Sequence, residues 1–100
     1  MRVEFSPAAL QHLTNILDSH LEYCGQRLKF SRQIDDIIHS LILFPESGFP
    51  EKSLADRAPS YRAKIINRNY KLIYYVDNDV IHISAIWDMR MHPAKLTKMI

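Results

Sequence analysis

Apolar positions in the first quarter of the chain predict one short strand and one amphipathic helix. Residues 2–5 alternate between polar and apolar side chains, which is typical of a strand. Ser6 and Pro7 follow, a good N-cap and a good first helical residue. Apolar side chains then recur at helical spacing, and Gly25 is the predicted end of this helix. The stripe consists of Leu10, Leu13, Leu17, Leu21 and Cys24.

A second apolar stripe predicts a second helix, which Pro45 ends. The two helices would form a hairpin with a very short connection. The second stripe consists of Phe30, Ile34, Ile37, Ile38, Leu41 and Phe44. Residues 44–60 then contain three prolines and a glycine without clean periodicity. Such a long loop in a compact domain is usually functional or held in place by its neighbours.

From Tyr61 onward the period changes to two, which predicts three antiparallel strands. A two-residue turn at Asn78-Asp79 would give one face with apolar or aromatic residues at every position. The predicted pairs are Val76 with Ile81, Tyr74 with Ile83, Leu72 with Ala85, and Tyr70 with Trp87. A second two-residue turn, at Arg68-Asn69, would add Ala63 and Ile65 to the same face. We therefore predict that this face forms the core.

The opposite face of these strands is predicted to be half basic and half apolar. Its members are Arg62, Lys64, Ile66, Lys71, Ile73, Tyr75, His82, Ser84, Ile86 and Asp88. Arg90 and His92 follow just beyond the end of the last strand, and Asp88 could orient the Arg90 guanidinium. Residues 93–100 suggest a short terminal helix or a tail. The predicted fold is α+β, with a helical hairpin on one face of a small, mainly antiparallel twisted sheet, in one domain spanning residues 1–100.

Composition restricts the class of protein but does not indicate a function. The chain of 100 residues is 47% hydrophobic and 24% charged, as in ordinary soluble globular proteins. Its single cysteine allows no intrachain disulfide and no paired-cysteine metal site, which favours a cytoplasmic setting. We expect no signal peptide and no membrane segment, because the longest apolar run is far too short to cross a bilayer. The formal net charge of +2 permits nucleic-acid contact without requiring it.

The candidate chemistry is phosphate binding by the basic face. Arg62, Lys64, Lys71 and Arg90 would converge there, and arginine offers a bidentate fork to phosphate. His92 is the candidate general acid or base, because histidine titrates near neutral pH. His82 is a weaker candidate, since Tyr75 opposite it could simply stack on the ring. The remaining histidines are interpreted as solvent-facing helix residues: His12, His20 and His39. We expect no cofactor and no metal.

Four segments occur in order over essentially the whole chain: "LILFPESGFPE", "YRAKI", "NYKLIYYV" and "IHISAIWDMRMHP". Together they resemble the RelE/ParE family of toxins from bacterial type II toxin–antitoxin systems. The resemblance implies the fold predicted above and a partner antitoxin. It also implies one of two targets. RelE-like members cut messenger RNA on the ribosome without a metal, whereas ParE-like members inhibit DNA gyrase and cut nothing.

In the RelE-like branch, basic residues of the family fall on Arg62, Lys64, Lys71 and Arg90, the same four that the predicted registers place together. Two positions depart from that branch. Lys71 stands where arginine is more usual, and Leu96 stands in the region where a base-stacking tyrosine is common. The resemblance implies that Arg62 and Lys64 bind phosphate or RNA, and that Lys71, Arg90 and His92 are catalytic.

The leading hypothesis is therefore a toxin that acts as a ribosome-dependent, metal-independent mRNA endonuclease and inhibits translation. A non-enzymatic inhibitor of DNA gyrase is the main alternative. A non-toxic binding module that retains the fold is the third. The expected partners are a cognate antitoxin together with the ribosome and mRNA, or gyrase in the alternative. A homodimer and a toxin–antitoxin hetero-oligomer both stay open.

Overall fold

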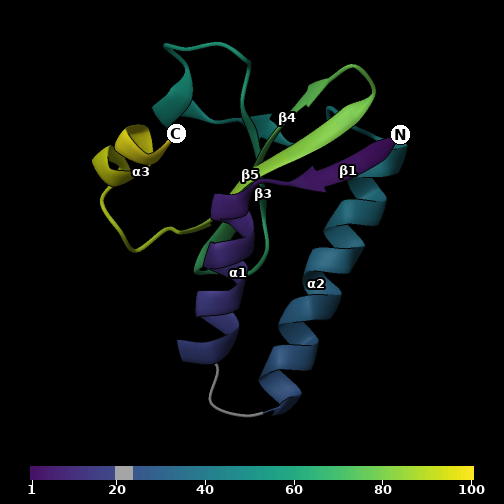
Figure 1. Ribbon diagram of the computed structural model, residues 1–100, viewed down its shortest axis with the longest axis vertical. Helices are drawn as coiled ribbons and strands as arrows, with labels where there is room; N and C mark the ends of the chain where they lie inside the picture. Colours follow the sequence, from purple (N-terminus) through teal and green to yellow (C-terminus); the bar gives the residue numbers. More distant parts are fainter. Residues whose placement is uncertain (20–23) are drawn as a thin grey trace.

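The computed structural model describes residues 1–19 and 24–100 (Figure 1). The elements follow the predicted order, with a short strand and a 3-10 turn added in the long loop. They are β1 (Arg2–Phe5), α1 (Pro7–Ser19), α2 (Cys24–Leu43), β2 (Phe49–Pro50), η1 (Lys52–Leu54), β3 (Arg62–Ile65), β4 (Tyr70–Asp77), β5 (Val80–Asp88) and α3 (Pro93–Met99).

The strands of the described residues form one five-stranded sheet in the order β1-β5-β4-β3-β2. Strand β1 runs parallel to β5, and every other neighbouring pair is antiparallel. The parallel pair requires the chain to cross over between the two strands, and the crossover includes the two long helices. Figure 1 shows α1 and α2 side by side on one side of the sheet. The predicted α+β class and the helical hairpin on a mainly antiparallel sheet are confirmed.

One side of the sheet, the helix face, packs against α1 and α2. Its centre is fully apolar or aromatic and includes Leu72, Tyr74, Ile81 and Ile83, all with no exposed surface. From the predicted stripes, α2 contributes three buried residues, and both helices add half-buried ones. The buried residues are Phe30, Ile34 and Leu41, and the half-buried residues are Leu13, Leu17, Ile37 and Ile38. Removing this area from water supplies the main driving force for folding.

The other side of the sheet, the loop face, carries a second and smaller core that the sequence did not predict. Here η1 and α3 cover the strands, and their buried side chains Leu54 and Leu96 pack against Ile73 and Trp87. The long loop is therefore held in place by its neighbours, one of the two outcomes expected of it. Both faces of the sheet are covered over part of their area, so the predicted basic face is not a single solvated surface.

The β4–β5 hairpin confirms the predicted turn and corrects the predicted register. Asn78 and Asp79 adopt positive φ angles of 50° and 62°, as a two-residue hairpin turn requires. Next to the turn, Tyr74 lies opposite Ile83 as predicted, but the register then shifts by one residue between Ile73 and Tyr74. A β-bulge at Ser84 causes the shift, because this residue has no partner in the ladder.

Beyond the bulge every predicted pair is wrong by one residue. Leu72 lies opposite Ile86 instead of Ala85, and Tyr70 lies opposite Asp88 instead of Trp87. Trp87 therefore leaves the helix face, but it stays buried because the loop face has a core of its own.

The β3–β4 connection was also predicted one residue too short. The Ile66 amide donates to the Tyr70 carbonyl at 3.0 Å, so three residues form the turn. The Asn67 side chain accepts from the Asn69 amide at 2.8 Å, an Asx contact that stabilises this longer turn. As a result Arg62 lies opposite Tyr74, where Ala63 was predicted to lie. Ala63 then lies on the loop face, and Ile65 on that same face is exposed.

The helix boundaries are partly as predicted. The Ser6 hydroxyl accepts from the Ala9 amide at 3.0 Å, which confirms it as the N-cap of α1. Gly25 does not end a helix. It lies in the first turn of α2, where the backbone amides lack intrahelical acceptors in any case. Leu10, predicted in the apolar stripe, is 51% exposed. The predicted stripe member Leu21 and the predicted solvent-facing His20 fall outside the described residues.

Candidate functional site

Arg90 emerges beyond the end of β5 with its guanidinium held in a fixed orientation. Its Nε and Nη2 donate to the two carboxylate oxygens of Asp88, each at 2.9 Å. The Arg90 Nη2 also donates to the Tyr70 hydroxyl at 3.2 Å. The hydrogen bonds that Arg90 donates to Asp88 are the main cause of the raised pKa of Arg90. This fork geometry confirms the expectation that Asp88 orients Arg90.

Tyr70 completes this cluster from the neighbouring strand. Its ring lies under the guanidinium, with 5.6 Å between the guanidinium carbon and the ring centroid, a cation–π distance. Burial is the main cause of the raised pKa of Tyr70, and the nearby Asp88 raises it further. The phenol therefore stays protonated at neutral pH. The Arg90 side chain is still 56% exposed, so a partner molecule can reach it.

A small cavity of about 210 Å³ lies next to this cluster, between α1 and the end of β5. Its lining includes His12, Asn15, Tyr70, Trp87, Asp88 and Met91. His12 was predicted to face solvent, and that is wrong. The Nδ1 atom of His12 accepts a hydrogen bond from the Ile86 amide at 3.3 Å, and burial lowers the pKa of His12. The sequence signal was its place directly before Leu13, at the border of the apolar stripe.

His92 is exposed and forms the N-cap of α3. Its Nδ1 atom accepts from the Ala94 amide at 3.0 Å. A nitrogen that accepts a hydrogen bond carries no proton, so neutral His92 has its proton on Nε2. In this arrangement the Nε2–H group is a hydrogen-bond donor that the N-cap contact does not use.

Lys71 does not lie on an open surface. Its Nζ forms an ion pair with the Glu51 carboxylate, and the two side chains are 15% and 4% exposed respectively. The Glu51 carboxylate also accepts from the Ser53 amide at 3.2 Å. The sequence analysis missed Glu51, because nothing in the loop pattern marks which carboxylate will be buried. The Lys71 charge is therefore neutralised inside the protein.

Arg62 and Lys64 belong to the other side of the sheet. They pair with Tyr74 and Leu72, so they project on the helix side, whereas Lys71 pairs with Trp87 on the loop side. The Arg62 guanidinium donates to the backbone carbonyls of Gly48 at 2.8 Å and Glu46 at 3.3 Å. Arg62 therefore holds the loop to the edge of the sheet. The four cations that the predicted registers placed on one face are thus divided between two.

Comparison with known proteins defines the family. The family model described as "ParE toxin of type II toxin-antitoxin system, parDE" matches residues 3–93 of this chain. The chain belongs to this family. The predicted resemblance to RelE/ParE toxins is thereby confirmed. A search of curated proteins found no match.

Solved toxin structures share the fold. A chain of the chromosomal ParDE system from P. aeruginosa superimposes with a TM-score of 0.67 at 20% identity, covering 88% of this chain and 95% of that one. The YoeB/ParE toxin from Agrobacterium tumefaciens gives 0.66 at 14% identity, with coverages of 88% and 98%. The YoeB dimer from Staphylococcus aureus gives 0.62 at 22% identity, with coverages of 86% and 93%. At these identities the likeness concerns the fold.

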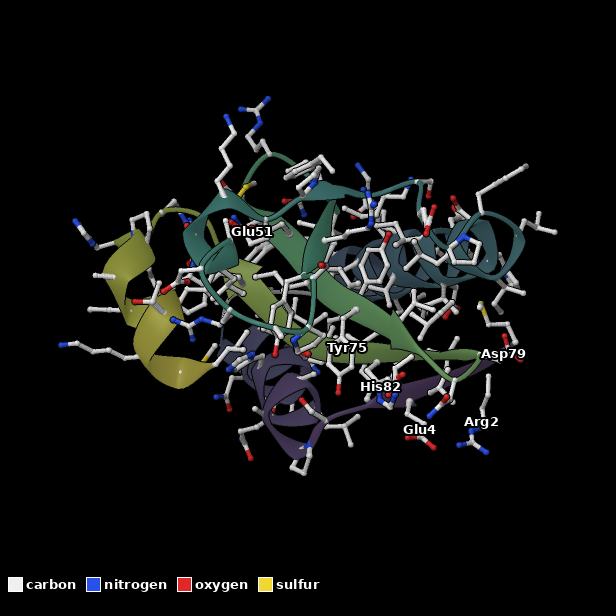
Figure 2. All side chains as sticks on the ribbon, turned by 90° about the horizontal axis from the view of Figure 1, so that it is seen from above. Arg2, Glu4, Glu51, Tyr75, Asp79 and His82 are labelled. Atoms are coloured by element: carbon white, nitrogen blue, oxygen red, sulfur yellow. The ribbon has the colours of Figure 1, made fainter. Side chains whose placement is uncertain are left out.

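Apart from the cluster around Arg90, the toxin carries a row of polar and aromatic side chains on the loop face. Tyr75 stacks on His82 with 4.6 Å between ring centroids, and Tyr61 meets Tyr75 edge-on at 5.4 Å. Glu4 of β1 lies 4.0 Å from the Nδ1 atom of His82. Figure 2 shows Tyr75, His82 and Glu4 in line across the strands, with Glu51 apart from them. The stack expected of His82 and Tyr75 is confirmed.

Within residues 1–19 and 24–100, no group of three or more histidine, cysteine or acidic side chains is arranged to hold a metal ion. In the same part of the chain, no helix has the length and apolar character needed to span a membrane.

Proposed function

We propose that this toxin inhibits DNA gyrase by protein–protein contact and cleaves no RNA. The observation that carries the proposal is that two residues predicted for nuclease chemistry are bonded to groups within the protein itself. Lys71 is neutralised by buried Glu51, and Arg62 is bonded to loop carbonyls on the opposite side of the sheet. A cleavage site built on clustered cations would need these charges free to face one phosphate. The match to the ParE family over residues 3–93 supports the same choice.

The surface also favours binding to a protein. At the end of α2, Leu43 is 72% and Phe44 is 67% exposed, and both line a shallow hollow with Met1 and Val76. Contiguous apolar side chains on a soluble protein usually mark an interaction site. Arg90 adds an oriented, exposed guanidinium elsewhere on the molecule, and arginine is enriched among residues that dominate binding energies.

We infer that an antitoxin neutralises this toxin in the cytoplasm by covering such surfaces. The structures of YoeB–YefM complexes and of a ParDE system show that proteins of this fold are found with a partner protein. A homodimer is the other assembly to test, because a YoeB dimer is known. The antitoxin would prevent target binding by occupying the surface that gyrase needs.

Ribosome-dependent mRNA cleavage is the second candidate function, and His92 is the observation that favours it. The N-cap contact uses Nδ1 of His92 and leaves its Nε2 side open, two residues after the oriented Arg90. In this scheme the ribose 2′-oxygen attacks the phosphorus as its proton passes to water, and Arg90 stabilises the charge on the phosphate. Protonated His92, released from the N-cap contact, donates its Nε2 proton to the leaving 5′-oxygen. Lys64 remains a candidate phosphate contact in this scheme, whereas Lys71 and Arg62 would first have to leave their present partners.

Two assays with the purified protein separate these functions. We expect equimolar toxin to block DNA supercoiling by gyrase, and mRNA to stay intact on translating ribosomes. Cleavage of mRNA only when ribosomes are present, with supercoiling unaffected, would select the nuclease. Inactivity in both assays, together with normal growth when the protein is expressed without an antitoxin, would indicate a binding module without toxicity. The Arg90→Ala variant serves as a matched control in each assay.

A further inference from the structure

Beyond Ile83, the outer edge of β5 is completed by Ser6 and His12 of the N-terminal segment rather than by a strand. Strand β1 pairs with β5 only as far as Ile83. The Ser6 amide then donates to the Ile83 carbonyl at 2.9 Å, and the Ser6 hydroxyl donates to the Ser84 carbonyl at 3.1 Å. The next outward group is the Ile86 amide, and the Nδ1 atom of His12 accepts its hydrogen bond. His12 thus satisfies an amide that no strand reaches.

This edge coincides with the β-bulge that sets the position of Arg90. Because Ser84 is extra, Asp88 lies opposite Tyr70, and both project on the helix side of the sheet. With unbroken pairing from the turn, Trp87 would occupy that place and Asp88 would project to the other side. Arg90 is held by Asp88 and Tyr70 together, so its present orientation depends on the shifted register.

We propose that His12 is a positioning residue for Arg90. Its neutral imidazole fastens the end of β5 to α1 in the shifted register, and this keeps Asp88 and Tyr70 together around the guanidinium. His12 touches neither Arg90 nor a target and acts through the backbone of β5. The role extends the proposed function, because it matters for toxicity only if Arg90 contacts the target.

The positioning role of His12 should depend on pH, which a simple packing role would not. Imidazolium carries a hydrogen on Nδ1 and cannot accept from the Ile86 amide, so the fastening exists only while His12 is neutral. Asparagine can present its side-chain oxygen near the same place and does not titrate. The other titratable groups that line the cavity are Tyr70 from β4 and Asp88 from β5, whereas α3 contributes the uncharged Met99.

The direct test follows the Arg90 Nε–H resonance by NMR in the full-length protein. We expect a resolved, slowly exchanging signal at pH 7.5 in the wild type and in His12→Asn, and loss of that signal in His12→Leu. As the pH is lowered, the wild-type signal should move to the chemical shift of an unbonded guanidinium with the same midpoint as the titration of the His12 ring, while the signal of His12→Asn keeps its position. The matched control is His39→Asn, which replaces an exposed histidine on α2. If the Arg90 signal of His12→Asn changes with the same pH midpoint as that of the wild type, the titrating group is Asp88 and the proposal is overturned. An intact signal in folded His12→Leu would also overturn it.

Gyrase inhibition measured over the same pH range then tests the functional part. We expect inhibition by the wild type to fall with the same midpoint as the change in the Arg90 signal, and inhibition by His12→Asn to be retained. If the Arg90 signal responds as stated but inhibition does not follow it, the positioning role stands and the part of the proposed function that rests on Arg90 fails. The two failures are therefore distinguishable.

Discussion

Lys71 and Glu51 form a buried ion pair between β4 and the loop that follows β2. Glu51 is the less exposed partner, at 4%, and it also accepts from the Ser53 amide. Removing one charge of a buried pair leaves the other charge unpaired in the low-dielectric interior of the protein. We expect Glu51→Gln or Lys71→Met alone to lower the free energy of unfolding by about 3–5 kcal/mol.

The double variant Glu51→Gln/Lys71→Met should be much closer to the wild type than the sum of the two single changes. Urea unfolding of all four proteins gives the coupling energy directly. Additive effects would show that the two side chains act independently and that the ion pair does not hold the loop.

Tyr74 fastens the same loop from the helix face. Its hydroxyl donates to the Pro45 carbonyl at 2.7 Å and accepts from the Gly48 amide at 3.0 Å. Tyr74→Phe would leave both backbone groups without this partner, and we expect a loss of about 1–3 kcal/mol in the free energy of unfolding. Hydrogen exchange should then accelerate at the Gly48 amide first. An unchanged exchange rate there would mean that the loop is held by other contacts.

Gly48 lies too close to Tyr74 for any larger residue. A Cβ atom at this position would lie 2.6 Å from the Tyr74 hydroxyl and 2.8 Å from the Ala63 carbonyl oxygen. The second neighbour is backbone in the sheet and cannot move easily. We expect Gly48→Ala to destabilise the protein by about 1–3 kcal/mol, as overpacked sites do. Ser47→Ala, at an exposed neighbour, is the matched control for the unfolding measurement.

Trp87 is an anchor of the core on the loop face. It is 6% exposed and packs in the same cluster as Leu54 and Leu96. We expect Trp87→Ala to cost about 3–5 kcal/mol in the free energy of unfolding, as truncations of large buried aromatics do. Met91→Ala, at a 40% exposed position, should change the unfolding midpoint little. Equal effects of the two substitutions would contradict the existence of a tight second core.

Arg90 should matter for activity and hardly for stability. Its guanidinium is exposed and bonded to Asp88 and Tyr70, and exposed ion pairs contribute little to folding. We expect Arg90→Ala to abolish growth arrest at matched expression without antitoxin, while the thermal unfolding midpoint stays at the wild-type value. Arg90→Lys should rescue activity only partly, because lysine supplies charge without the fork. An alanine variant as toxic as the parent would remove Arg90 from the mechanism.

Stability should depend on His12 below neutral pH. Burial lowers the pKa of His12 from its ordinary value of 6.5, so the unfolded chain binds the proton more readily than the folded one. The contribution of neutral His12 is therefore present above pH 6.5 and is lost as the pH falls through the lowered value. The difference in urea midpoint between the wild type and His12→Leu should be smaller at pH 5 than at pH 7.5. A difference that is constant with pH would contradict the shift.

Local and periodic information in the sequence determined much of this protein. Ser6 and Pro7 start α1, the turn at Asn78 and Asp79 starts the β4–β5 hairpin, and the period-two pattern after Tyr61 predicts the strands. Each signal depends on neighbours within a few residues, so the α+β class and the order of the elements could be predicted. The motif order likewise pointed to the toxin family, which the match over residues 3–93 confirmed.

The tertiary structure alone decided which side chains share a face. The bulge at Ser84 is held by Ser6, 78 residues away, and its edge is completed by His12, 74 residues from Ile86. A single extra residue reverses the side on which every later side chain projects, so Asp88 met Tyr70 and Trp87 left the helix face. The same kind of long-range contact buried Lys71 against Glu51. No pattern along the strands contains these contacts, because they depend on where distant segments lie after the chain has folded.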